Sequence, residues 1–268
     1  MFVYNINPVL FTIGPLEVRY YGIIMASSVL LGIYMILMLA RKKKIDLDEN
    51  TLLELCFYMV IAGLIGARIL HIILDRSGFY IQNPSEMIAI WHGGLSIHGA
   101  VAGAVVAALV YCRKKKISFY KIADIAVIPL ALGLCFGRIG NFLNGELYGK
   151  ITNVLWAVKF PGVEGFRHPS QFYEAFKNLA IFTMLWNLNT YNMKKKRFQD
   201  GFIFWTFVFV YSVLRFIVEF FKLSEIYYLS LNIAQIISIG LIILSVPFLI
   251  KLSRKPKKHM KNKRIKKK

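Results

Sequence analysis

Residues 133–149 read GLCFGRIGNFLNGELYG and end a long apolar run. Within this stretch, Arg138, Asn141, Asn144 and Glu146 follow one another inside nine positions. Charged and amide side chains at the end of a membrane-length segment are costly to bury, so a bilayer protein keeps them mainly where function needs them. The frequent glycines let backbones or a ligand approach closely. We therefore predict that this stretch binds an anionic headgroup at the outer edge of a membrane.

The composition is typical of a membrane protein. Of the 268 residues, 57% are hydrophobic, and the formal net charge is +20. The basic residues stand in groups between apolar runs, whereas those of a soluble nucleic-acid-binding protein cover a polar surface. Several apolar runs are about 20 residues long, enough to cross a hydrocarbon core of roughly 30 Å. The sequence predicts an all-α polytopic membrane protein that does not bind nucleic acid.

Seven apolar segments are predicted to span the membrane. They cover about residues 18–40, 51–74, 92–112, 119–143, 170–190, 201–221 and 231–250. Groups of Lys and Arg follow the first, third, fifth and seventh segments, and cytoplasmic segments retain such groups. The N-terminus is therefore predicted outside and the C-terminus in the cytoplasm. Residues 1–250 form one predicted catalytic domain, residues 144–168 its longest extracytoplasmic loop, and residues 251–268 a basic cytoplasmic tail.

Small residues are interpreted as packing residues. Cys56, Cys112 and Cys135 lie in apolar surroundings and lack the spacing of metal ligands, so we expect small buried hydrophobic side chains. The glycine pairs 99/103 and 133/137 have the spacing of close helix contacts. The sequence predicts neither a metal site nor a cofactor.

With this orientation, polar residues from six segments reach one layer near the outer surface. They are Tyr20, Tyr21, Arg68, His71, His98, Arg138, Asn141, His168, Gln171, Glu174, Arg215 and Glu219. Arg138 and Arg215 offer planar donor forks and permanent charge, which suit a phosphate. His98 has no second ligand at zinc spacing and suits proton transfer better than metal binding. Glu219, four residues after Arg215, is expected to pair with it.

Other interpretations stay open at this point. Arg68 could be a packing arginine paired with a carboxylate. A transporter or flippase for an anionic lipid would also need buried arginines, although its polar residues are expected near the midplane and on both sides of the membrane. An intramembrane protease would have to use Ser96, which lacks the glycine two positions later that a hydrolase elbow requires.

Four motifs in order resemble those of the bacterial prolipoprotein diacylglyceryl transferases. Residues 137–146 resemble the family's signature, 93–99 (GGLSIHG) a second motif, 167–174 (RHPSQFYE) a third and 211–221 a fourth. The tripeptide at 20–22 also fits near the start. Two features depart from the pattern. The loop at 144–168 is short for the family, and His71 stands where an aromatic residue is expected, which leaves the binding site for the protein substrate open.

The resemblance implies a reaction and a place for it. The diacylglyceryl group of phosphatidylglycerol moves to the lipobox cysteine thiol of a preprolipoprotein, and the products are a thioether and glycerol phosphate. It implies the bacterial cytoplasmic (inner) membrane, with the active site toward the outer leaflet and membrane lipids as further partners.

The resemblance also implies residue roles. Arg138 and Arg215 are the phosphate clamp and His98 is the candidate base, unless an arginine lowers the thiol pKa enough and His98 only hydrogen-bonds the lipid. Glu219 would orient Arg215. The implied substrate-binding residues are Tyr21, Arg138, Asn141, Glu146, Gly149, His168, Tyr211 and Glu219.

Overall fold

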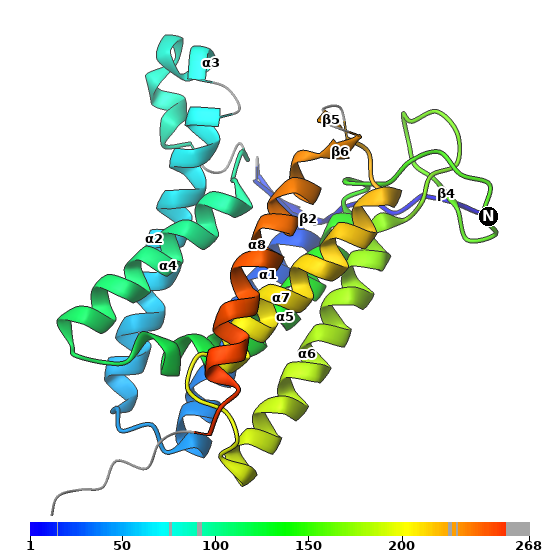
Figure 1. Cartoon of the computed structure of the whole chain (residues 1–268). Helices are drawn as coiled ribbons and strands as arrows, with labels where there is room; N and C mark the ends of the chain where they lie inside the picture. Colours follow the sequence, from blue (N-terminus) through cyan, green and yellow to red (C-terminus); the bar gives the residue numbers. More distant parts are fainter. Residues whose placement is uncertain (15, 75–76, 90–92, 225–226, 229, 256–268) are drawn as a thin grey trace, which may run out of the picture. The chain divides into compact units, whose positions relative to one another are not determined.

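The computed structural model describes residues 1–14, 16–74, 77–89, 93–224, 227–228 and 230–255. The chain divides into two compact units, one of Met1–Gly32 with Ala123–Lys268 and one of Ile33–Ile122. Each unit is mainly helical (Figure 1) and is described by itself. The prediction of an all-α membrane protein is confirmed, although small two-stranded sheets accompany the helices.

Six described helices are long and apolar enough to cross a membrane. They are α1 (Tyr20–Lys43), α2 (Glu49–Leu74), α4 (Ile97–Lys114), α5 (Phe119–Leu143), α7 (Phe202–Val218) with the 3-10 turn Glu219–Phe221, and α8 (Ile233–Leu252). α6 (Ser170–Lys195) is as long as α2 but less apolar, because its buried face carries glutamine, glutamate, lysine and asparagine. The polytopic class is confirmed, whereas the count of seven spans and their orientation stay predictions.

The predicted boundaries agree with the helices to within three residues, except at the start of α4 and at the end of α6, which continues to Lys195 where the prediction stopped at about residue 190. The segment predicted at 119–143 coincides with α5. The segment predicted at 92–112 becomes helical only at Ile97, because Gly93 and Gly94 have φ angles of +86° and +76°, which a right-handed helix excludes. Residue 92 lies outside the described residues, as do residues 256–268 of the predicted tail.

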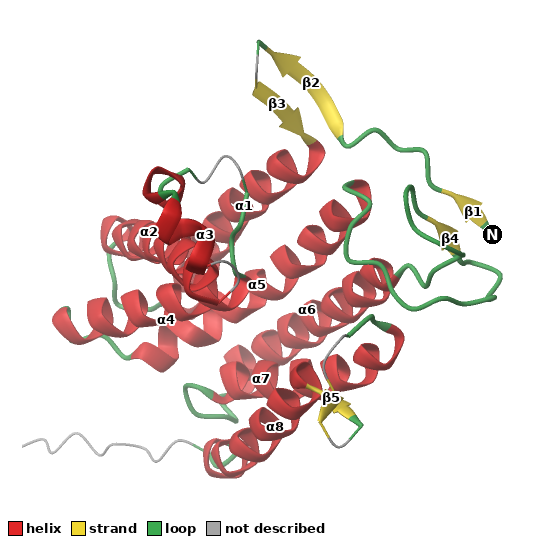
Figure 2. Cartoon of the chain, turned by 90° about the horizontal axis from the view of Figure 1, so that it is seen from above, coloured by secondary structure: helices red, strands yellow, loops and turns green. Residues whose placement is uncertain are grey.

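In the first unit, α6, α7 and α8 lie side by side (Figure 1). Strand β1 (Phe2–Val3) pairs in parallel with β4 (Val158–Lys159), and the antiparallel hairpin β2 (Val9–Ile13) and β3 (Leu16–Arg19) leads into α1 (Figure 2). A third pair, β5 (Tyr227–Tyr228) and β6 (Leu231–Asn232), precedes α8.

A small buried core holds the N-terminal segment on the loop that follows α5. Tyr4, Phe142, Val158 and Phe160 pack together there, and the Tyr4 hydroxyl donates to the carbonyl oxygen of Leu143 at 2.7 Å. This core fixes residues 144–168 at the end of α5.

Asp124 joins the start of α5 to the start of α7. Its carboxylate is 1% exposed and accepts hydrogen bonds from the backbone amides of Gly201 and Phe204, both at 2.9 Å. Gly201 is the N-cap residue of α7 and Phe204 lies in its first turn, where backbone amides have no partner within the helix. The contact fixes the register between α5, which carries Arg138, and α7, which carries Arg215.

In the second unit, α2 and α4 pack closely through glycines. A Cβ atom on Gly99 would lie 2.2 Å from the carbonyl oxygen of Gly66, and one on Gly103 would lie 2.1 Å from that of Ala62. The predicted close contact at 99/103 is confirmed. The prediction for 133/137 is wrong, because a Cβ on Gly133 would meet nothing within 4 Å and one on Gly137 only the sulfur of Met25.

Other described elements of this unit are α3 (Ser77–Gln82) and a 3-10 turn at Pro84–Met87. The three cysteines of the chain are free and buried, as predicted.

Candidate functional site

The carboxylate of Glu174 lies at the centre of a group of charged side chains in the first unit. Glu174 is near the start of α6, and its side chain is 1% exposed. Its Oε1 accepts a hydrogen bond from Arg215 and lies 3.5 Å from Nζ of Lys222. Its Oε2 accepts from Nζ of Lys177 at 2.5 Å and lies 4.0 Å from Nε of Arg138. One carboxylate therefore brings together cations from α5, α6, α7 and the residue after the 3-10 turn.

Glu219 completes this group, which we call the charged cluster: Arg138, Glu174, Lys177, Arg215, Glu219 and Lys222. Oε2 of Glu219 lies 3.0 Å from Nη2 of Arg215 and 3.8 Å from Nζ of Lys222, so the expected pair is present. Four cations and two carboxylates leave a net charge of +2. No three His, Cys, Asp or Glu side chains in the described ranges could hold a metal ion. The excess charge of the cluster suits an anionic ligand.

Arg138 has the most unused hydrogen-bonding capacity in the charged cluster. Its side chain is 18% exposed, and its one ion-pair contact among the described residues is Glu174 at 4.0 Å. It donates no hydrogen bond to any described residue, whereas Arg215 donates to Glu174 and pairs with Glu219. A guanidinium carries five N–H donors in a planar fork. The Arg138 donors are therefore available to the oxygens of a phosphate.

Two tyrosines approach the charged cluster from α1 and α7. The ring of Tyr211 lies 4.2 Å from Nζ of Lys177, a cation–π contact. The hydroxyl of Tyr21 interacts electrostatically with Arg138 and Glu146. Neither hydroxyl is hydrogen-bonded to a described residue. Both can therefore donate to a ligand held by the cluster.

The chain turns back after α5 through contacts centred on Glu146. Nδ2 of Asn141 donates to Oε1 of Glu146 at 2.8 Å, and Nε2 of Gln171 donates to the backbone carbonyl of Glu146 at 2.6 Å. A Cβ on Gly149 would lie 2.3 Å from the carbonyl oxygen of Phe221, so glycine is required there. These contacts tie the end of α5 to the start of α6 and to the segment after α7.

His168 lies just before α6, at the edge of this region. Its Nδ1 is 2.9 Å from the hydroxyl of Tyr173, and its ring packs edge-on against Phe221 with centroids 5.3 Å apart. Burial lowers the pKa of His168 below its ordinary value. A neutral imidazole is thus favoured, which can hydrogen-bond a hydroxyl without adding charge.

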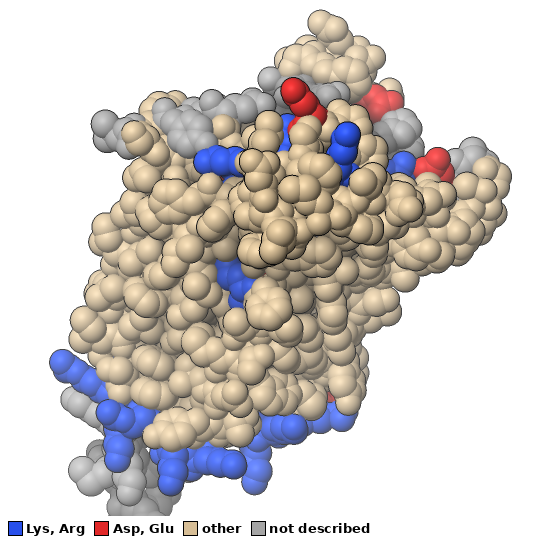
Figure 3. Space-filling model, turned by 90° about the vertical axis from the view of Figure 1, so that its right-hand side faces the viewer, with Lys and Arg blue, Asp and Glu red and all other residues tan. Residues whose placement is uncertain are grey.

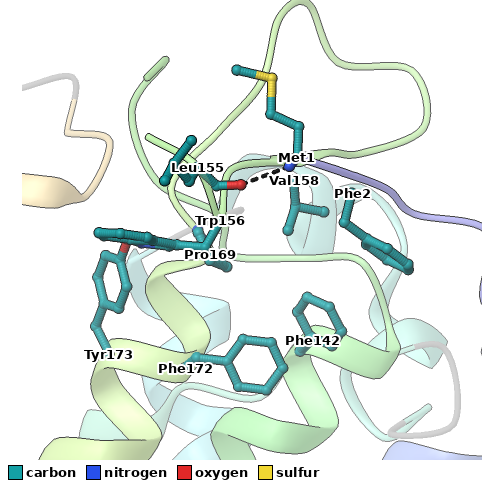
Figure 4. A pocket seen from close by; sticks show the side chains of 9 residues that line it. All are labelled: Met1, Phe2, Phe142, Leu155, Trp156, Val158, Pro169, Phe172 and Tyr173. Atoms are coloured by element: carbon teal, nitrogen blue, oxygen red, sulfur yellow. Dashed lines mark hydrogen bonds between the residues drawn. The ribbon is translucent and has the colours of Figure 1, made fainter. Parts of the chain in front are cut away.

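An apolar hollow of about 470 Å³ is lined in part by Tyr173, the hydrogen-bond partner of His168 (Figure 4). Its wall includes Tyr173, whose hydroxyl accepts from Nε1 of Trp156 at 2.7 Å, and the amine of Met1, which donates to the carbonyl of Leu155 at 2.6 Å. The lining residues are Met1, Phe2, Phe142, Leu155, Trp156, Val158, Pro169, Phe172 and Tyr173. Apart from the Met1 amine, this lining is mainly apolar and aromatic, which suits hydrocarbon.

His98 belongs to the other unit and is described there. It lies in the first turn of α4 with an exposed side chain. The segment before it is held by Arg68, which is 6% exposed. The Arg68 guanidinium donates to the carbonyl oxygens of Glu86, Met87, Ala89, Gly93 and Gly94. Arg68 is therefore a packing arginine, but the expected carboxylate partner is wrong, because backbone carbonyls take its place.

Comparison with known proteins decides the family. The sequence model described as Prolipoprotein diacylglyceryl transferase matches residues 8–251. The chain belongs to this family. The match covers most of the first unit, all of the second and every predicted site residue, and the family inferred from the four motifs is confirmed.

Relatives named phosphatidylglycerol–prolipoprotein diacylglyceryl transferase are similar over most of their length. One from Rickettsia bellii (strain OSU 85-389) is 35% identical over 257 residues, which is 92% of this chain and 95% of the relative. One from Rickettsia rickettsii (strain Sheila Smith) is 37% identical over 248 residues, or 90% and 94%. One from Geobacter sulfurreducens is 36% identical over 220 residues, or 81% and 83%.

Sequence reasoning missed part of the charged cluster. It put Glu174 in the outer polar layer without a role, and it did not single out Lys177 or Lys222. Lys177 did carry a signal, because it follows Glu174 by three residues and so shares a helix face with it inside a predicted membrane span. Lys222 carried none, since lysines that end a span commonly extend toward the interface.

Proposed function

We propose that this transferase moves the diacylglyceryl group of phosphatidylglycerol to the lipobox cysteine thiol of preprolipoproteins. A thioether forms and glycerol phosphate leaves, in the first step of bacterial lipoprotein maturation. The names of the relatives support the two substrates. The observation that carries the proposal for the site is the charged cluster, whose net positive charge and free Arg138 donors suit a phosphodiester.

The proposed clamp is Arg138 and Arg215, which both contact Glu174. Glu219 orients Arg215 through the pair at 3.0 Å. Fixed donors aimed at developing charge are worth several kcal/mol in a dry site. The clamp therefore stabilises the leaving phosphate. Tyr21 and Tyr211 add hydroxyl donors.

The headgroup pocket is proposed to comprise the turn after α5 and the start of α6. Asn141 and Glu146 hold one another at 2.8 Å and present amide and carboxylate groups to the glycerol hydroxyls. Gly149 permits the close approach of the segment at Phe221. His168 offers a neutral ring.

His98 is the proposed base. A thiol has a pKa of about 8.5, so it must lose its proton to attack at neutral pH. The side chain of His98 is exposed at the start of α4. We expect His98→Gln to abolish turnover while lipid binding survives. Turnover near that of the unmodified protein would remove His98 as the base.

The orientation proposed is N-terminus outside and C-terminus in the cytoplasm of a bacterial inner membrane. Lys and Arg gather along the lower edge of the face shown in Figure 3, and both α6 and α8 carry lysines in their last turns. Positive groups of this kind stay on the cytoplasmic side. Since α6 begins near Glu174 and ends at these lysines, the charged cluster would lie toward the outer leaflet. Residues 1–250 would act as one catalytic domain and residues 251–268 as a membrane-surface anchor.

The proposal is tested by a transfer assay. Purified protein is mixed with phosphatidylglycerol and a lipobox peptide, and the mass of the peptide is followed. Arg138→Ala and a Cys→Ser peptide should each abolish the diacylglyceryl gain, whereas Arg254→Ala, an exposed arginine after α8, should not. Folded protein that binds the lipid and transfers nothing would favour the lipid transporter instead.

A further inference from the structure

We infer that Lys177 is a positioning residue whose charge matches the second negative charge that the phosphate acquires as it leaves. The inference rests on the proposed function and assigns a part of it to a residue that the family motifs do not include. Lys177 is 3% exposed and lies on α6, one turn from Glu174.

The charge balance of the reaction sets the requirement. The thiolate sulfur attacks the glycerol carbon that is esterified to phosphate, and a C–S bond forms. The C–O bond breaks, and its electron pair remains on the phosphate oxygen. A thiolate and a phosphodiester each carry one negative charge, and the products are a neutral thioether and a phosphate monoester. Because the second pKa of such a monoester is about 6, it carries nearly two negative charges above neutral pH.

The charged cluster balances this product only when Lys177 is counted. With Lys177 the net charge is +2, and without it the charge is +1. The +1 cluster would match the phosphodiester substrate but not the dianion. An interaction that strengthens as the reaction proceeds accelerates the chemical step, whereas one that is equal in substrate and transition state does not.

Local pairing alone does not account for Lys177. Glu174 already accepts a hydrogen bond from Arg215 and has Lys222 at 3.5 Å. A third close cation at 2.5 Å exceeds what neutralising one carboxylate requires. Lys177 offsets the negative charge of Glu174, so that the positive charges of Arg138 and Arg215 remain available to a ligand. The ring of Tyr211 at 4.2 Å holds the ammonium in place.

The test compares Lys177→Met with Lys195→Met, which removes an exposed lysine at the far end of the same helix. Transfer kinetics are measured with phosphatidylglycerol, and inhibition constants at pH 8 for glycerol phosphate and for its methyl diester. Removing one positive charge from the charged cluster should weaken the preference for the monoester on the order of tenfold. The turnover number should fall by a similar factor, while KM and the diester constant change much less.

Glu174→Gln with Lys177→Met keeps the net charge at +2, because one charge of each sign is lost. We expect this double variant to regain monoester preference relative to Lys177→Met, and Lys177→Arg to retain it. If Lys177→Met does not fold, Glu174→Gln is compared with the double variant instead. The net charge of the cluster is +3 in Glu174→Gln and +2 in the double variant, so the preference for the monoester must be weaker in the double variant.

An unchanged ratio of monoester to diester affinity in folded Lys177→Met would overturn the inference, as would equal changes in KM and turnover. Unmodified protein that transfers nothing would instead overturn the proposed function. The two failures are distinguishable, because transfer by the unmodified protein tests the proposed function, whereas the ratio of monoester to diester affinity in Lys177→Met tests the inference.

Discussion

Replacement of Arg68 by lysine is the sharpest test of how the segment before α4 is held. The Arg68 guanidinium uses all five of its N–H donors on five backbone carbonyls, with distances from 2.5 to 3.2 Å. Lysine has three donors on a single atom, so at least two carbonyls lose their partner. Each loss costs about 1 to 3 kcal/mol, and four of the five bonds are only partly buried, which favours the lower half of that range. We expect Arg68→Lys to lower the free energy of unfolding by about 2 to 4 kcal/mol.

The same replacement should also slow transfer. Arg68 holds the carbonyl groups of Gly93 and Gly94, which come just before the helix turn that carries His98. A loosened segment would leave the proposed base misplaced, and small misplacements of a catalytic group cost about a hundredfold in rate. Unfolding would be followed in detergent by chemical denaturation, and transfer by the mass of a lipobox peptide.

Arg113→Lys is the matched control, because Arg113 is exposed near the end of α4. It should change the free energy of unfolding by no more than about 0.5 kcal/mol. If Arg68→Lys unfolded and turned over like this control, the carbonyl contacts would not position the segment, and the reasoning would be refuted.

The remaining predictions concern packing, capping and pH. Gly103→Ala should lower the free energy of unfolding by about 1 to 3 kcal/mol, because the new Cβ would lie 2.1 Å from a backbone oxygen between α2 and α4. Gly133→Ala is the control in the same assay, and it should be neutral or stabilising because its Cβ would meet nothing within 4 Å. Asp124→Ala should cost about 1 to 2 kcal/mol in that assay, because the first turn of α7 loses its acceptor. Burial lowers the pKa of His168 in the folded protein. As the pH is lowered below ~6.5, the unfolded state therefore binds this proton more readily than the folded state does, and the free energy of unfolding decreases. His168→Gln should flatten that fall, and an identical melting profile from about pH 5 to 7.5 would contradict it.

The helices could be predicted because the bilayer fixes their length. An apolar run must cross the hydrocarbon core, and α5 coincides with the segment predicted from Phe119 to Leu143. The late start of α4 could not be read the same way, since apolarity continues through residues whose φ angles exclude a helix. The strands at the N-terminus were also missed. β1 is two residues long and pairs with a distant partner, and no periodicity signals such a pairing.

The depth of the site in the membrane could be predicted, but the contacts between its residues could not. Counting along each span placed Arg138 and Arg215 in one layer, and both contact Glu174. Depth says nothing about which helices are neighbours, so the carboxylate between them had no assigned role. The partners of Arg68 were hidden for another reason. Backbone carbonyls are present at every residue, and their use by a side chain leaves no trace in the sequence.

Glu174 explains how so many cations can gather before any ligand arrives. Arg138, Lys177, Arg215 and Lys222 would repel one another in a site of low dielectric, and the carboxylate within 4.0 Å of each lowers that repulsion. Two carboxylates against four cations still leave the charged cluster short of neutrality. A third carboxylate would bring its net charge to +1 and a fourth to zero, and the attraction for a phosphate would weaken with each. The two carboxylates therefore lower the repulsion enough for the four cations to gather, and the remaining charge of +2 attracts an anionic ligand.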